Sequence, residues 1–331
     1  MNTKQNKLED NMYKEPSRLM QFLRMYMGVL IGLVGLFIFL SIATDTFLTP
    51  DNLIVVLRQV SINAMLAFGM TYVILMGDID LSVGMVMAFS GIVTTVSLTR
   101  WGVPLPGAVT LGLLSGALVG IVNGMIVSKL KLPSFIVTLS LSYIAKGFAY
   151  IISNGMPVSV EEPAFYAIGN GYLGPIPYPV IYMIAVFAIL SFVLYRLKFG
   201  RKVYAIGGNI EAAKYSGINV ARIKIISFTI LSILAALGGI VQCARLFSGQ
   251  PTIGVNAELD AIAAVILGGT SFSGGVGTLF GSLIGALLIG IINNGLNLLG
   301  VSSFWQWVAK GAVILLAVYI DVMRKNNSKA Q

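Results

Sequence analysis

Long apolar segments constrain this chain more than any other feature. A helix needs about 20 apolar residues to cross the hydrocarbon core of a membrane. Only 11% of the 331 residues are charged, against about 25% in soluble domains. The sequence therefore predicts an all-α membrane protein with about ten transmembrane helices, near residues 25–43, 53–76, 82–99, 106–127, 133–152, 178–195, 225–246, 259–270, 278–298 and 304–321. The eighth segment is short enough for a broken or re-entrant helix.

The spans form one domain. A single transmembrane domain is predicted over 25–321, between an N-terminal segment, 1–24, and a tail, 322–331. No Pro- or Ser-rich linker and no low-complexity tract interrupts it. The first apolar run is longer than that of a usual signal peptide, so we expect it to remain as an anchor.

Basic residues in the short connecting segments predict the orientation, because Lys and Arg accumulate on the cytoplasmic side. With a cytoplasmic N-terminus, 17 basic residues fall inside and Arg100 alone falls in the outer loops. Both termini are then cytoplasmic, which requires an even number of spans. The 17 are Lys4, Lys7, Lys14, Arg18, Arg24, Lys129, Lys131, Arg196, Lys198, Arg201, Lys202, Lys214, Arg222, Lys224, Arg324, Lys325 and Lys329.

Four further basic residues lie within predicted spans: Arg58, Lys146, Arg245 and Lys310. An ionisable group inside a membrane is a functional candidate. The alternative is that these side chains reach the outer surface or pair with neighbouring groups.

Catalytic chemistry is not indicated. The chain has no His and a single Cys, Cys243, which excludes imidazole bases, disulfides and Cys/His metal sites. No phosphate-binding GxxxxGK[ST] motif occurs, and the Gly-rich stretch 268–277 lacks a lysine, so we interpret it as a flexible turn. If transport is active, ATP and Mg²⁺ must bind to a separate subunit; we expect no catalytic residue, metal or cofactor on this chain.

The two halves of the chain show an ordered self-similarity. Residues 111–118 resemble 280–287, Ser134-Phe135 resembles Ser303-Phe304, and 67–69 resembles 236–238, always at an offset of 169. A shift of five spans reverses helix direction, which indicates an inverted repeat, as in many transporters; chance similarity between Gly-rich helices is the alternative. Glycines at every fourth position, 112 to 124 and 277 to 285, are typical of close helix packing.

The longest predicted inner loop, 196–219, is expected to contain a short helix over 210–216. Asn209 is a suitable N-cap and Gly217 a suitable terminator. Such a helix is either a docking site for a cytoplasmic motor, or a lipid-headgroup helix, or an inert connector.

Polar residues near and within the spans have two interpretations. Asp78 and Asp80 lie between the second and third spans. They either bind a coupling proton or cation, or Asp80 or Ser82 simply caps the following helix. Amides and aromatic rings suit a polyhydroxyl ligand but also hold helices together. The candidates for a transport pathway are Asn63, Asn123, Asn293, Asn294, Asn297 and Trp305.

Several motifs resemble the permease family of bacterial monosaccharide ABC importers. Residues 77–84 read GDIDLSVG, close to the family's GGIDLSVG, with Asp78 in place of the second glycine. Further similar stretches are AIGGN at 205–209, SGINV at 216–220, ELDAIAAVILGGTS at 258–271 and NNGLNLLGVSS at 293–303; the last two most resemble the ribose members.

The resemblance implies a ten-helix permease of the vitamin-B12-importer type (type II) in the bacterial inner membrane. It implies a homodimer or heterodimer of permeases, a cytoplasmic ABC ATPase, an extracytoplasmic sugar-binding protein, and no nucleic acid. ATPase docking would fall on the 204–217 segment, at Tyr204, Gly207, Gly208, Asn209, Glu211, Ala212, Ser216 and Gly217. The cargo would be ribose or a similar monosaccharide; a nucleoside, a furanosyl signal molecule or a branched amino acid stays open, as does an ion-coupled transporter that uses Asp78, Asp80, Lys146 or Lys310.

The turn between the fourth and fifth spans is a candidate gate. It joins two repeat-related helices at the predicted inner face, and Pro133 suits the first turn of a helix. We expect this turn to close the inner mouth, with Lys131, Pro133, Ser134 and Phe135 as its residues.

Overall fold

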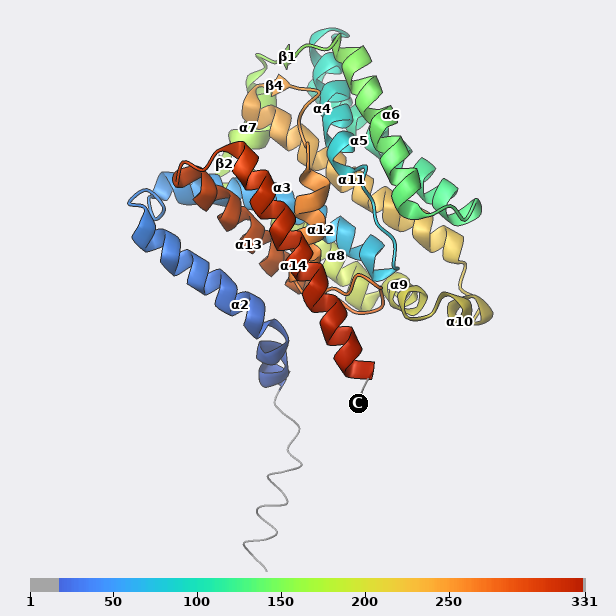
Figure 1. The fold of residues 1–331 in the computed structure, drawn as a ribbon. Coiled ribbons are helices and arrows are strands. Elements are labelled where there is room, and N and C mark those ends of the chain that lie inside the picture. The colour runs from blue at the N-terminus through green and yellow to red at the C-terminus, as the bar shows by residue number, and fades with distance from the viewer. Residues whose placement is uncertain (1–17, 330–331) are drawn as a thin grey trace, which may run out of the picture.

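The computed structural model describes residues 18–329, and most of these residues are helical (Figure 1). Each predicted span coincides with a helix. These helices are α2 (Arg18–Ala43), α3 (Pro50–Leu75), α4 (Val83–Thr99), α5 (Leu105–Lys129), α6 (Ser134–Ser153), α8 (Tyr178–Arg196), α11 (Val220–Leu246), α12 (Ala257–Leu267), α13 (Leu279–Leu298) and α14 (Ser303–Lys329). Lys4, Lys7, Lys14 and residues 330–331 lie outside the described residues, as do the side chains of Arg18, Arg24, Arg324, Lys325 and Lys329.

Within the described residues, seven helices are long and apolar enough to cross a membrane: α2, α3, α5, α6, α8, α11 and α13. Helix α4 is apolar but has 17 residues, and α12 has 11. The prediction of a short eighth segment is therefore confirmed, whereas the count of about ten spans stays a prediction. Helix α14 continues without a break through residues 322–329, and the division into N-terminal segment, transmembrane domain and tail stays a prediction.

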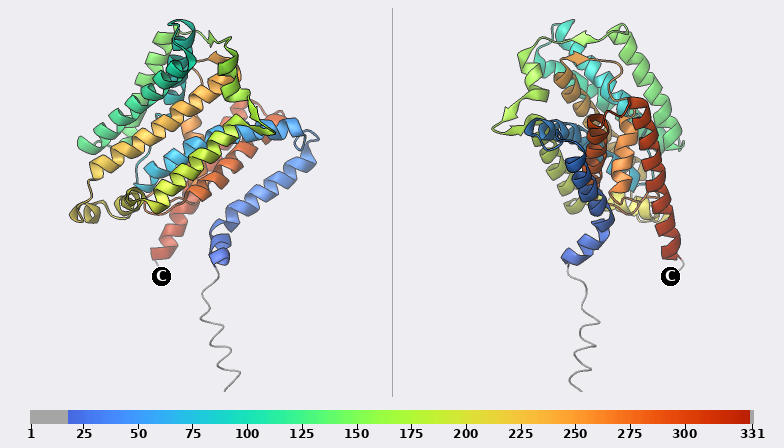
Figure 2. Two further views of the ribbon diagram at one scale, coloured as in Figure 1. Left: turned by 180° about the vertical axis from the view of Figure 1, so that it is seen from behind. Right: turned by 60° about the vertical axis from the view of Figure 1, so that its left-hand side comes forward.

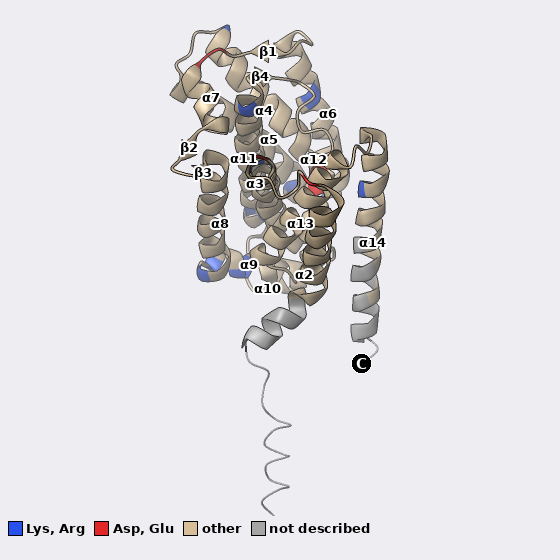
Figure 3. Cartoon of the chain, turned by 90° about the vertical axis from the view of Figure 1, so that its left-hand side faces the viewer, with Lys and Arg blue, Asp and Glu red and all other residues tan. Residues whose placement is uncertain are grey.

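Two ends of the bundle can be distinguished in Figure 1. The β1 end carries α7 (Pro163–Asn170) and two short antiparallel pairs: β1 (Val158–Ser159) with β4 (Ser248–Gly249), and β2 (Tyr172–Leu173) with β3 (Ile176–Pro177). The opposite, α9 end carries α9 (Lys198–Gly208) and α10 (Ile210–Tyr215). In Figure 3, positions of Lys and Arg, coloured blue on the ribbon, gather where α8 meets α9.

Local sequence sets several helix ends. Thr49 precedes Pro50 and accepts a hydrogen bond from the Asn52 amide at 3.4 Å, which caps α3. Thr278 caps α13 by accepting from the Gly281 amide at 3.0 Å. Helix α6 ends where Asn154 takes the left-handed conformation, with φ of 58°.

Helix α5 packs against α11 through its glycines, as their spacing predicted. Gly112, Gly116, Gly120 and Gly124 are buried. A Cβ atom on Gly120 would lie 2.7 Å from the Phe228 carbonyl oxygen. A larger residue at these positions would push the two backbones apart. Small residues in membrane helix interfaces allow this close approach.

Equivalent contacts recur around α3, whose residues 64–75 are buried at the centre of the core. Helices α4 and α5 pack on α11, and α12 and α13 pack on α3. Under the offset of 169 these pairs correspond, and α6 and α14 begin at Ser134 and Ser303, 169 residues apart. Helix α14 lies beside α12 at the edge of the bundle (Figure 2).

The two short helices α4 and α12 meet N-terminus to N-terminus. A Cβ atom on Gly84 would lie 2.1 Å from the Gly254 carbonyl oxygen, and one on Gly254 would lie 2.3 Å from the Gly84 carbonyl oxygen. Helix α4 runs from this contact to the β1 end, and α12 runs from it toward the α9 end (Figure 1). Only glycine permits this approach, and at Gly254 the backbone φ of +81° also favours it.

Candidate functional site

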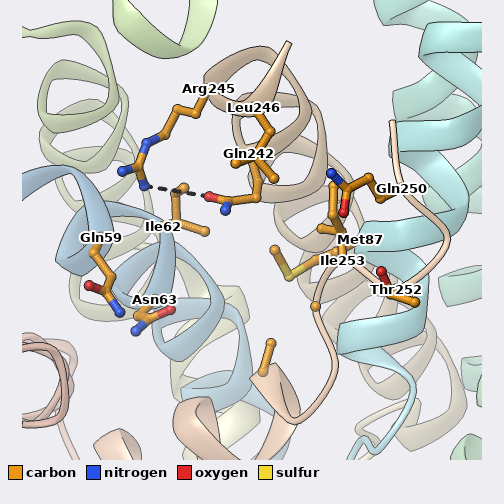
Figure 4. A pocket seen from close by; sticks show the side chains of 12 residues that line it. Gln59, Ile62, Asn63, Met87, Gln242, Arg245, Leu246, Gln250, Thr252 and Ile253 are labelled. Carbon is orange, nitrogen blue, oxygen red and sulfur yellow. Dashed lines mark hydrogen bonds between the residues drawn. The ribbon is translucent and has the colours of Figure 1, made fainter. Parts of the chain in front are cut away.

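A polar cavity opens among α3, α4, α11 and the segment that leads into α12 (Figure 4). Its volume is about 450 Å³. The polar side chains that line it are mostly amides and a hydroxyl: Gln59, Asn63, Gln242, Gln250 and Thr252, with Arg245 as its charged group. Neutral donors and acceptors on several sides can bind a polar, uncharged ligand without a fixed counter-ion.

The meeting point of α4 and α12 borders the cavity. Met87, Gly254 and Ala257 line it, and Gly254 is the residue that contacts Gly84. Because two backbones touch here, no space is left between α4 and α12 at this contact.

Buried polar residues surround the start of α4. Asn123 donates to the Ser82 hydroxyl at 2.9 Å, and Ser82 donates from its hydroxyl and its amide to Asp80 Oδ1, at 2.6 and 2.7 Å. The Ser82 side chain makes no capping bond to the helix. Of the two capping candidates, Asp80 therefore bonds an amide at the helix start, and Ser82 serves instead as a link to α5.

Asp78 pairs with Lys224, at 2.7 Å between Oδ2 and Nζ. This ion pair joins the α3–α4 connection to the first turns of α11. Burial raises the pKa of Asp78, and the Lys224 ammonium opposes the shift. The Lys224 ammonium therefore already supplies a positive charge to the Asp78 carboxylate, in the place that a coupling ion would take.

The basic residues predicted inside spans mostly have partners. Arg58 donates to the Asn170 carbonyl at 3.0 Å and lies 4.9 Å from the centre of the Tyr172 ring. Lys310 pairs with Asp260 at 2.9 Å. Arg245 donates to the Gln242 oxygen at 3.5 Å and also borders the cavity. Partners thus account for three of the four, one of which lies at the candidate site, and the fourth, Lys146, is exposed.

The pathway candidates are separated in space. Asn63 lines the cavity. Asn123 bonds Ser82, Asn293 donates to Asp260 at 3.2 Å, and Asn294 exchanges hydrogen bonds with Asn52 at 2.8 and 3.2 Å. Asn297 accepts from Gln306 at 2.8 Å, and the Trp305 side chain is exposed. The five candidates other than Asn63 therefore lie at interhelical contacts or at the surface, and none of them lines the cavity.

Sequence reasoning missed most of the cavity. Gln59 lies one helical turn before Asn63, and Gln242 lies three residues before Arg245. This spacing puts each pair on one face of its helix, and it is the signal that could have found them. That the faces of α3 and α11 converge is visible only in the fold.

The segment between α8 and α11 contains two helices where one was expected. The predicted short helix is present as α10, with Asn209 accepting from the Glu211 and Ala212 amides at 3.0 Å each. Helix α9 precedes it and was not predicted. Tyr215 is 90% exposed, Gly217 has φ of +77°, Glu211 pairs with Lys214 at 2.6 Å, and the Ser216 hydroxyl donates to the Ala212 carbonyl.

The candidate gate turn is also at the α9 end. Lys131 has φ of 55°, and Phe135 is half exposed. Ser134 and Thr138 accept hydrogen bonds from the Ile79 and Leu81 amides, at 3.1 and 3.0 Å. The turn beside Pro133 is thereby tied to the connection that leads into α4, and its gating role stays a prediction. Among the described residues, no cluster of His, Cys, Asp or Glu could hold a metal ion.

These features define a multi-pass α-helical membrane protein with a polar cavity bounded by the two short helices α4 and α12. The chain belongs to the family described as the branched-chain amino acid transport system / permease component, whose model matches residues 52–318.

Named relatives are sugar permeases. The chain is 47% identical to the ribose import permease protein RbsC of Bacillus subtilis, over 89% of this chain and 92% of the relative. It is 46% identical to RbsC of Escherichia coli K12, over 88% and 92%. It is 39% identical to the xylose transport system permease protein XylH of Haemophilus influenzae, over 90% and 96%. No solved structure matches the chain significantly.

Proposed function

We propose that this chain is the membrane-spanning permease subunit of an ATP-driven importer for ribose or a similar monosaccharide. The observation that carries the proposal is the cavity of about 450 Å³ lined by Gln59, Asn63, Gln242, Gln250 and Thr252. Its size is that of a small-molecule site, and its amides can exchange hydrogen bonds with sugar hydroxyls. The ribose and xylose permeases among its relatives support the same cargo class.

Substitutions in the cavity test the proposal. Uptake of radiolabelled ribose and xylose would be measured in cells that lack their own permease and express this chain with its neighbouring ATPase and binding-protein genes. Gln242→Leu should lower uptake about tenfold or more, since an amide buried against the sugar loses its hydrogen bonds. Gln306→Leu, on α14 outside the cavity, is the control. Parental uptake by the Gln242 variant would remove the cavity from the pathway, and no uptake of any sugar by the parent would remove the function.

A branched-chain amino acid is the second candidate cargo, favoured by Arg245 at the cavity and by the family description. A guanidinium binds a carboxylate through two parallel hydrogen bonds. Competition by leucine or valine in the same uptake assay distinguishes the two cargos: sugar uptake unaffected by excess amino acid supports the first.

We infer a membrane topology of ten spans, the seven long helices plus α4, α12 and α14, arranged as an inverted repeat of the type found in vitamin B12 importers. The equivalent packing of α4 and α5 on α11 and of α12 and α13 on α3 supports this arrangement. The basic α9 end is then cytoplasmic, with both chain termini, and the β1 end faces outward.

Cysteine labelling tests this orientation. Cys243 is buried and would be replaced by Ser. Single cysteines at Ser159, beside the β1–β4 pair, and at Ser216, beside α10, are both at exposed positions. An impermeant thiol reagent should label the first and not the second in intact cells. Equal labelling contradicts the topology.

The partners follow from this arrangement. A cytoplasmic ABC ATPase, which binds ATP and Mg²⁺, docks at α10; an extracytoplasmic sugar-binding protein delivers cargo at the β1 end; and two permeases form a homodimer or heterodimer. The exposed, capped α10 supports the docking site. Gly217→Val should release the ATPase during purification, because φ of +77° strongly disfavours a β-branched residue. Gly155→Val, at a glycine of the β1 end with φ of +72° and open space around it, is the matched control, because it introduces the same backbone strain away from the docking segment.

A further inference from the structure

The loop between α12 and α13, residues 268–278, has a defined conformation. The Ser271 amide bonds the Val276 carbonyl at 2.8 Å, and the Gly274 amide bonds the Ser271 carbonyl at 3.0 Å. Gly274 and Gly275 both have positive φ, 84° and 78°. The glycines therefore build a specific turn rather than the flexible one that the sequence indicated.

Tyrosines from three helices hold the end of this loop. The Tyr204 hydroxyl of α9 donates to the Gly277 carbonyl at 2.7 Å. The Tyr195 hydroxyl of α8 accepts from the Leu279 amide at 3.1 Å, and the Tyr26 hydroxyl of α2 bonds the Thr278 side chain. A surface connection seldom receives three hydroxyl contacts unless its position matters.

Backbone contacts join the loop to α9 and to the end of α3. The Gly275 amide bonds the Leu75 carbonyl at 2.9 Å. A Cβ atom on Gly207 of α9 would lie 1.7 Å from that carbonyl oxygen and 2.5 Å from the Gly275 nitrogen. Three segments meet here with their backbones in direct contact at Gly207.

Both helices at the cavity are joined to this meeting point. The loop follows the C-terminal end of α12 directly, and the first residue of α12, Ala257, lines the cavity. Leu75 leads through residues 76–82 into α4, whose Gly84 contacts Gly254. The contact at Gly207 is therefore connected by short, fixed segments to both sides of the α4–α12 junction.

We propose that the junction of Gly207 with Leu75 and Gly275 is the coupling point of the transporter, and that Tyr204 is a positioning residue that holds α9 to the 268–278 loop. This rests on the proposed function, since it assigns α9 to transmit the movement of the docked ATPase to α4 and α12. Opening of the α4–α12 junction then depends on α9 and on the hydrogen bond from Tyr204 that holds α9 to the loop. Tyr204 acts inward, toward Gly277, and not on the ATPase.

The test measures sugar imported per ATP hydrolysed, in proteoliposomes that contain the complete importer. Tyr204→Phe keeps the ring and removes the bond to Gly277, so it should lower this ratio about fivefold, within the usual range of coupling between sites. ATPase copurification and the thermal unfolding midpoint should stay near parental values. Tyr143→Phe, whose side chain is 68% exposed on α6, is the matched control and should keep the parental ratio.

The outcomes are distinguishable. A Tyr204→Phe importer with the parental ratio overturns the coupling role while the proposed function stands. Loss of the ATPase from the purified Tyr204→Phe complex also overturns it, because Tyr204 would then belong to the docking surface. A parental importer that moves no sugar overturns the proposed function instead. As a second variant, Gly207→Ala should reduce the ratio further than Tyr204→Phe, since its Cβ collides with the Leu75 carbonyl.

Discussion

The α5–α11 interface and the α12–α14 region lie on different sides of the bundle and are held in different ways. Between α5 and α11, four glycines bring backbone against backbone, and Gly116 would place a Cβ 2.6 Å from that of Ala236. Helix α14 is instead held to α12 by a polar contact, the Lys310–Asp260 pair, and Asn293 of α13 also bonds Asp260. Helices α12 and α13 themselves meet closely at a glycine, since a Cβ on Gly285 would lie 1.9 Å from the Ala264 carbonyl oxygen.

This difference indicates which of the two regions can change its arrangement. A glycine interface is fixed by shape and offers one arrangement, whereas a polar contact can break and re-form at modest cost. Helix α12 is also shorter than α4, the other short helix, and is joined to the 268–278 loop. We therefore expect α5 and α11 to move as one body and α12 to change its position against them.

The largest effect is expected at the glycine interface. Gly120→Leu should lower the free energy of unfolding by more than about 3 kcal/mol, because its neighbours within 2.7 Å include the Phe228 carbonyl and the Thr229 Cα and backbone atoms cannot move aside. Thermal unfolding in detergent and the yield of monodisperse protein measure it. Gly147→Leu on α6, with nothing within 4 Å, is the control. Equal losses in both variants would mean that α5 and α11 are not a tight pair.

Breaking the Lys310–Asp260 ion pair, which joins α14 to α12, should have the next largest effect. Asp260→Ala leaves Lys310 without its carboxylate, which costs about 3 kcal/mol, the low end for a buried pair, because both side chains keep some exposure, 12% and 20%. Glu211→Ala removes the exposed pair with Lys214 and should cost less than about 1 kcal/mol. Urea or thermal unfolding compares the two.

A double variant sharpens this result. Asp260→Asn with Lys310→Gln replaces the charges by amides and should recover much of the stability lost in Asp260→Ala, since no uncompensated charge is left. A double variant as unstable as Asp260→Ala would show that shape, not charge, holds α14, and the contrast with the glycine interface would disappear.

The sequence was sufficient for features that depend on neighbours along the chain. The apolar runs located the helices, the glycine spacing located the α5 interface, and Asn209 located the start of α10. Each rests on a local rule: the length needed for a span, the four-residue helical repeat or a side-chain cap.

Features that need two distant segments were not predictable. The cavity combines α3, α11 and residues 250–257, and its Gln59 and Gln242 are 183 positions apart in the chain. Asn293 and Asn294 look like pathway residues in the sequence, but their partners, Asp260 and Asn52, hold them between helices. An amide in a membrane helix has the same appearance in both roles until its partner is known.

A smaller effect is expected where α6 holds the connection before α4. Thr138→Val removes the acceptor of the part-buried Leu81 amide, 3.0 Å away, and should cost about 1 kcal/mol as an unmade hydrogen bond. Thr110→Val is the matched control, because its exposed hydroxyl bonds only the Pro106 carbonyl of its own helix. If the two variants were equally stable, residues 78–82 would not be anchored by α6, and the first half would be as adaptable as the second.

The smallest effect separates the two kinds of interface most directly. Asn52 of α3 and Asn294 of α13 exchange two hydrogen bonds, at 3.2 and 2.8 Å, and both are buried. A double-mutant cycle with Asn52→Ala and Asn294→Ala should give a coupling energy of about 1 kcal/mol, within the range measured for interhelical hydrogen bonds in membranes. Ser115 and Ser90, on α5 and α4, provide the comparison at 3.1 Å. The Ser115 hydroxyl also bonds the Gly112 carbonyl of its own helix at 2.7 Å, so the cycle with Ser115→Ala and Ser90→Ala should give a coupling near zero. Equal coupling energies in the two cycles would contradict the distinction, because polar contacts would then contribute as much beside the glycine interface as they do between α3 and α13.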